Sequence, residues 1–205
     1  MCVEIMRDYD TAAAWREMAA EWSGWLAWSG VRECPLEHAA TAAIHSLRML
    51  LVLAGSSGSG KSPIRRFLLE DGAPLVAGLP IHSHDFDENG VPVDANTEWR
   101  QQSGKAWIER ALEYAKVGEH LLLSANWPLG EVLATPRAPL LDGIALCLID
   151  CGDTERAKRL RARQQPSYSD RQIWNFVLFA AWQRLHHADP SWMPEVIVGH
   201  WPEMV

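Results

Sequence analysis

Short apolar runs alternate with segments of helical spacing through the middle of the chain. Four runs have the length and composition of buried strands, and amphipathic or mixed segments separate them. This alternation predicts an α/β fold, in which helices flank a parallel sheet. The predicted strands are residues 49–54, 75–77, 120–124 and 144–149, and the predicted helices are residues 62–70, 97–117 and 130–134.

The two ends of the chain have a different pattern. Residues 1–48 are rich in Ala and Trp, with apolar positions at helical spacing, and predict an N-terminal helical extension to a main domain at residues 49–205. Beyond the last predicted strand, Pro166 ends an arginine-rich helix and marks the tip of a predicted lid. The lid covers residues 155–171, a further helix covers 170–186, and a short strand covers 195–198.

Composition narrows the class of protein. A length of 205 residues and 48% hydrophobic content suit a folded domain with an appendage. The net charge of −7 argues against sequence-independent nucleic-acid binding, and no apolar run has the length of a membrane span. The N-terminus lacks a secretory pattern and the four cysteines lack CxxC spacing, so we expect a cytoplasmic protein without a zinc site.

The most informative motif follows the first predicted strand. It matches GxxxxGK[ST], the phosphate-binding loop, and a strand before it and a helix after it argue against a chance glycine-serine linker. The loop amides and the helix N-terminus favour a phosphate group, so we expect ATP there, with Lys61 at the β- and γ-phosphates and the Ser62 hydroxyl on Mg²⁺. The motif comprises Gly55, Ser56, Ser57, Gly58, Ser59, Gly60, Lys61 and Ser62.

An acidic segment, residues 82–98, holds five carboxylates and no Lys or Arg. A carboxylate there can orient an attacking hydroxyl and accept its proton; the alternative is a solvated turn. Trp99 and Arg100 follow. We expect Trp99 to form an apolar wall of the acceptor site and Arg100 to contact a polar part of the acceptor. The alternative for Arg100 is a position on a solvated helix face. His82 and His84 lack further metal ligands at suitable spacing, which favours a substrate contact or a surface position.

The arginine-rich helix begins after the strand at 144–149. Arg156, Arg159 and Arg163 share one helix face, and arginines stabilise the charge of a phosphoryl group in transfer. We expect phosphate contacts from Arg159 and Arg163 in particular. The alternative is a solvated helix in which Glu155 pairs with Arg159.

Together the three motifs resemble the small P-loop phosphotransferases of the nucleoside-kinase and gluconate-kinase type, and among them the chloramphenicol phosphotransferases. In those kinases an Asp followed by a bulky apolar residue contacts the acceptor hydroxyl, which implies Asp85, before Phe86, with Asp87 as the alternative. The resemblance spans residues 49–198. The chain departs from it after strand 120–124, where relatives often carry an Asp and Ser124 and Asn126 stand here.

The sequence therefore predicts an ATP- and Mg²⁺-dependent phosphotransferase acting on a hydroxyl of a small organic acceptor, such as an antibiotic or nucleoside-like compound. Its expected catalytic residues are Lys61, Asp85, Arg159 and Arg163, and Asp87, Trp99, Arg100 and Asn126 are expected at the acceptor. The alternatives are a nucleotide or tRNA-end kinase, or a P-loop regulatory ATPase. In the latter the Trp-rich N-terminal helices are a docking surface; otherwise they pack on the core or join copies of the chain in a homo-oligomer.

Overall fold

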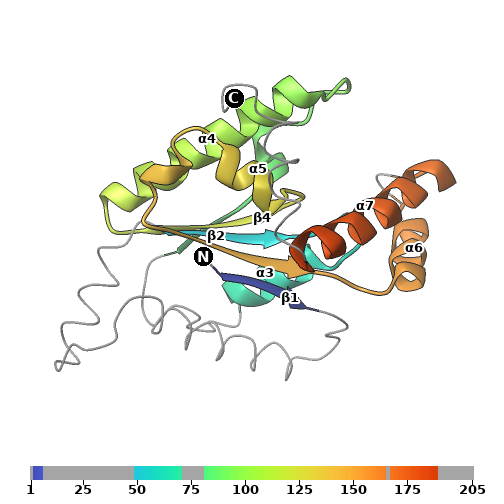
Figure 1. Ribbon diagram of the computed structural model, residues 1–205. Coiled ribbons are helices and arrows are strands. Elements are labelled where there is room, and N and C mark those ends of the chain that lie inside the picture. The colour runs from blue at the N-terminus through green and yellow to red at the C-terminus, as the bar shows by residue number, and fades with distance from the viewer. Residues whose placement is uncertain (1, 7–48, 71–80, 165–166, 189–205) are drawn as a thin grey trace, which may run out of the picture.

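The computed structural model describes residues 2–6, 49–70, 81–164 and 167–188, and they form an α/β fold around one parallel sheet (Figure 1). Five strands run in the order β1-β5-β2-β4-β3. All four pairings between neighbours are parallel. The strands are β1 (Cys2–Met6), β2 (Met49–Ala54), β3 (Ile81–Asp85), β4 (His120–Ala125) and β5 (Gly143–Ile149).

The apolar runs of the sequence form the central strands of the sheet. Strand β2 lies between β5 and β4, and every one of its residues is buried. A strand covered on both faces needs apolar side chains at successive positions rather than at alternate ones. The same holds for β4, which is buried along its whole length.

Helices cover both faces of the sheet and its carboxyl end (Figure 1). Helix α4 packs Trp107 and Ile108 against Val52 and Leu123 of the central strands. Helices α6 and α7 lie beyond the carboxyl ends of the strands, where the phosphate-binding loop also lies. The helices are α3 (Lys61–Glu70), α4 (Thr97–Lys116), α5 (Leu129–Ala134), α6 (Asp153–Ala162) and α7 (Asp170–Ala188), with 3-10 helices η1 (Phe86–Asn89) and η2 (Ala138–Leu140).

The structure confirms most of the predicted elements and corrects two. Residues 2–6, predicted within a helical extension, form β1 and pair with β5 in the core sheet. Strand β3 was not predicted, because its sequence Ile-His-Ser-His-Asp is mostly polar and its residues are only half-buried. The predicted strands at 75–77 and 195–198, the helices expected within 7–48 and the boundary at residue 48 lie outside the described residues.

None of the helices in the described parts of the chain combines the length and the apolar character that a membrane crossing requires.

Candidate active site

The phosphate-binding loop connects β2 to α3 with a backbone that takes a positive φ at each of its three glycines, Gly55, Gly58 and Gly60. Gly55 has a φ of 151°, and a Cβ there would lie 2.4 Å from the carbonyl oxygen of Ile149. Gly60 has a φ of 105°. Such positive φ values strain any residue with a side chain. The glycines therefore shape the loop that delivers Lys61 to the first position of α3.

Lys61 folds back over this loop. Its Nζ donates to the carbonyl oxygens of Gly55 at 2.5 Å and Ser56 at 3.2 Å. Burial lowers the pKa of the ammonium to about 8; Asp85 acts in the opposite direction, and Arg156 and Arg163 add to the lowering. Lys61 is thus a cation in a site where charge is costly, which a bound polyphosphate would offset.

Strand β3 presents its two faces to different helices. His82 stacks on Tyr114 of α4, with ring centroids 4.0 Å apart, and His84 bonds the Tyr114 hydroxyl at 2.9 Å. Ser83 faces the other way and accepts a hydrogen bond from Arg65 of α3. Side chains alternate along a strand, so Asp85 shares the α3 side with Ser83. This brings Asp85 close enough to act on the charge of Lys61.

Phe86, between Asp85 and Asp87, anchors the acidic segment to the core. Phe86 is buried, and its ring contacts Trp127 and Trp99. The indole N–H of Trp107 donates to the Phe86 carbonyl at 3.0 Å, and that of Trp99 donates to the Gly90 carbonyl at 3.0 Å. Aromatic residues of α4 therefore hold the acidic segment at Phe86 and Gly90, while residues 87–98 are exposed to solvent.

The two carboxylates beside this anchor have different surroundings. The Asp85 side chain caps η1 and accepts from the Asp87 amide at 3.2 Å. Burial raises the pKa of the Asp87 carboxyl, the charge of Asp85 raises it further, and Lys61 and Arg100 oppose the rise. Both carboxylates therefore lie within electrostatic reach of Lys61, and neither is isolated from the phosphate-binding loop.

Arg100 takes part in an ion pair that links three elements of the site. Its guanidinium forms a two-pronged ion pair with Glu131, whose side chain is only 5% exposed, with contacts of 2.6–2.9 Å. It also donates to the Asn126 carbonyl at 2.5 Å. Arg100 therefore joins α4 to α5 and to the segment after β4, instead of facing solvent from the helix.

Two residues at the carboxyl end of β4, Ser124 in the strand and Asn126 just after it, have buried polar atoms. Ser124 is 1% exposed, and its hydroxyl has no hydrogen-bond partner among the described residues. In the sheet it is the register partner of Asp85 on β3 and of Leu53 on β2. The Asn126 side-chain oxygen is also buried without a partner in this part of the chain.

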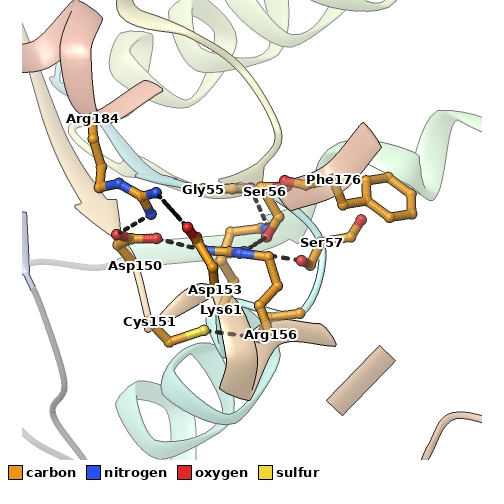
Figure 2. A network of polar contacts seen from close by, with 11 residues as sticks. Gly55, Ser56, Ser57, Lys61, Asp150, Cys151, Asp153, Arg156, Phe176 and Arg184 are labelled. Atoms are coloured by element: carbon orange, nitrogen blue, oxygen red, sulfur yellow. Dashed lines mark hydrogen bonds and ion pairs between the residues drawn. The ribbon is translucent and has the colours of Figure 1, made fainter. Parts of the chain in front are cut away.

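A buried ion-pair network joins the phosphate-binding loop to α6 and α7 (Figure 2). Arg156 is fully buried and donates to the carbonyls of Ser56 at 3.3 Å and Ser57 at 3.0 Å, and to Asp150. Arg184 of α7 binds the other oxygen of Asp150 at 3.0 Å. Asp150 and Arg156 are thus structural supports of the loop.

Two further points of this network hold the loop from other sides. Arg184 also binds Asp153 at the start of α6, at 3.0 and 3.1 Å. The Ser56 hydroxyl donates to the Phe176 carbonyl of α7 at 2.7 Å. The back of the phosphate-binding loop is therefore attached to both carboxyl-terminal helices.

The two arginines expected at the phosphates lie in α6 and directly after it. Arg159 binds Glu155 one turn away at 2.9 Å, the arrangement expected as the alternative for this helix. Its Nη1 nevertheless lies 3.5 Å from where a Cβ on Gly60 would be, directly against the loop. Arg163 is exposed at the end of α6 and is close enough to lower the pKa of Lys61.

The donors around Lys61 suit a hydrated Mg²⁺ that arrives with a nucleotide. Ser62 is exposed in the first turn of α3, and Ser124 and Asp85 are register partners on the neighbouring strands β4 and β3. Oxygen ligands and waters are what Mg²⁺ prefers. No cluster of three or more His, Cys, Asp or Glu residues suited to a metal occurs in the described ranges, and His82 and His84 bond Glu119 and Glu88 instead.

Comparison with known proteins gives the class of fold. No protein-family model matches the sequence, and neither does any curated protein. A chain in the solved structure of the Pnkp1/Rnl/Hen1 RNA repair complex has a similar fold, with a TM-score of 0.51 and 16% sequence identity. The match covers 67% of this chain and 45% of that chain, so the protein spans less than half of its neighbour's length. At this identity the similarity is one of fold: a parallel sheet flanked by helices, which in this chain carries the phosphate-binding loop described above.

Sequence reasoning missed three charged residues that shape the site: Arg65, Glu88 and Arg184. Arg65 stands one helical turn after Lys61, so helical spacing alone could have drawn attention to it. No comparable signal marks Arg184, because its partners Asp150 and Asp153 are more than 30 residues away in the chain.

Proposed function

We propose that the protein is a phosphotransferase that moves the γ-phosphoryl group of ATP to a hydroxyl of a small organic acceptor. The observation that carries this proposal is the position of Asp85 at the carboxyl end of β3, on the α3 side of the sheet, within electrostatic reach of Lys61 in the phosphate-binding loop. A nucleotide switch needs the loop and its lysine but has no use for a carboxylate that can orient an attacking hydroxyl.

In this proposal the loop amides and Lys61 hold the phosphates, and Asp85 orients the acceptor hydroxyl and takes up its proton. Arg159 and Arg163 balance the charge on the transferring group. Mg²⁺ would be held through Ser62 and the nucleotide, with Asp85 and Ser124 reaching its waters, and would neutralise phosphate charge. Asp87, Trp99 and Asn126 would line the acceptor side.

A second candidate is a kinase that acts on a nucleotide or on the end of a nucleic acid. The similarity to a chain of an RNA repair complex is what favours it. Such an acceptor brings phosphates, which call for cations on the acceptor side. The cations described there are engaged, Arg100 with Glu131 and Arg65 with Glu88. This charge balance favours a small acceptor without phosphates.

The test is ATP turnover with Mg²⁺, measured alone and with a panel of acceptors: nucleosides, sugars, hydroxylated antibiotics and oligonucleotides with a 5′-hydroxyl. Stimulation by a small acceptor, with formation of its phosphate ester, is the expected result. Stimulation only by oligonucleotides would favour the second candidate. Turnover that no acceptor changes would refute the proposal and favour a regulatory ATPase. Lys61→Ala is the control that should abolish every response.

A further inference from the structure

Arg65 lies on α3 one turn beyond Lys61 and reaches across to the acidic segment. Its Nε donates to the Ser83 hydroxyl at 2.9 Å, and its Nη2 donates to the Ser83 carbonyl at 3.0 Å. The same Nη2 binds Glu88 Oε1 at 3.0 Å. One guanidinium thus holds β3 on one side of Asp85 and η1 on the other.

Glu88 links Arg65 to the backbone of Asp85. Its Oε1 accepts the Asp85 backbone N–H at 2.8 Å, and its Oε2 bonds His84 Nδ1 at 2.7 Å. Burial favours the protonated form of Glu88, but the bonds from His84 and the Asp85 amide, with the charge of Arg65, lower its pKa overall. Glu88 is therefore an anion with all its partners on the segment that carries Asp85 and on α3.

The ion pair between Arg65 and Glu88 is better suited to positioning Asp85 than to stabilising the fold. The side chains of Arg65 and Glu88 are 25% and 41% exposed, and ion pairs this exposed contribute little to stability. Placement of a reacting group is far more sensitive, since an error of about 1 Å can cost about 10²-fold in rate. Two hydrogen bonds to Ser83 and one to Glu88 give Arg65 the directional hold that such placement needs.

We propose that Arg65 is a positioning residue, which acts through Glu88 and Ser83 to hold Asp85 in register with Lys61. The inference rests on the proposed function, because the position of Asp85 affects turnover only where Asp85 orients an acceptor hydroxyl. It adds that one side chain, Arg65, fixes the position of α3, which would bind the phosphates, relative to the acidic segment, which would bind the acceptor. Lys61 and Arg65 belong to the same helix, so the distance between phosphate and acceptor is built into α3.

Two variants and one control test the role in turnover. Arg65→Met and Glu88→Gln should each lower kcat by about tenfold or more with the best acceptor of the panel, and leave the KM for ATP within about twofold. Because both act on the same contact, the double variant should be no slower than the slower single variant. Arg65→Lys should recover part of the rate. Arg66→Gln removes the same charge from an exposed neighbour on α3 and should leave kcat unchanged. Losses that multiply in the double variant would overturn the proposal.

A second readout needs no acceptor. The pKa of Lys61, followed by NMR titration of the labelled lysine, should fall in Asp85→Asn because the nearby carboxylate is lost. If Arg65→Met lets Asp85 move away, the pKa of Lys61 should fall there too. Loss of the Arg65 charge alone would raise it, so the direction of the shift is diagnostic. A rise or no change would overturn the proposal. A fall without acceptor-stimulated turnover would support the positioning role and refute the proposed function.

Discussion

Replacing Asp150 with asparagine is expected to destabilise the protein by about 3–5 kcal/mol, the usual cost of removing one partner from a buried ion pair. The Asp150 side chain is 6% exposed and accepts from Arg156, which is fully buried, and from Arg184. Asparagine keeps the shape but leaves the Arg156 charge uncompensated beneath the phosphate-binding loop. At about 2–4 °C per kcal/mol for a chain of this size, the melting temperature should fall by roughly 6–20 °C.

Urea and thermal unfolding measure this effect, with Arg161→Gln as the control. Arg161 and Asp170 form an ion pair at 3.2 Å, but their side chains are 62% and 86% exposed. Water screens such a pair, so its loss should cost at most about 1 kcal/mol. The reasoning fails if the two variants unfold within about 1 kcal/mol of each other, because burial would then not set the strength of the network.

Three further predictions concern the site. Lys61→Met should stabilise the ligand-free protein at pH 7 by up to about 3 kcal/mol, because Lys61, with its pKa lowered from 10.5 to about 8, carries a costly charge there. Wild-type protein should recover that stability between pH 8 and 10.5, as its folded form loses the proton first, whereas the variant should show no such slope in urea titrations. For the same reason, calorimetry should find ATP affinity falling by up to about tenfold per pH unit above pH 8. Asp85→Asn should cut acceptor-dependent turnover by about 10²–10⁴-fold with unchanged ATP affinity, and Asp87→Asn should do less; the reverse order would move the assignment by two residues. Arg100→Met should cost about 3–5 kcal/mol by removing the arginine that forms an ion pair with the buried Glu131, whereas unchanged melting with a raised KM for the acceptor would make Arg100 a binding residue.

Local sequence was enough to predict the centre of this fold and the phosphate-binding loop. Strands β2, β4 and β5 are apolar along almost their whole length, because both faces of a central parallel strand are covered. The loop was equally readable, since the glycines, Lys61 and Ser62 act within a few residues of one another. The central strands and the loop each depend on residues close together in the chain, so a short stretch of sequence is enough to predict them.

The arrangement around Asp85 depended on tertiary structure. The mostly polar β3 escaped prediction, because half-buried positions that face Tyr114 on one side and Arg65 on the other leave no apolar pattern. Sequence alone also could not place the two carboxylates relative to Lys61, since their positions follow from strand order and from the packing of α3. Ion pairs such as Arg65 with Glu88 join residues over 20 positions apart, and periodicity reports the burial of each residue but not its partner.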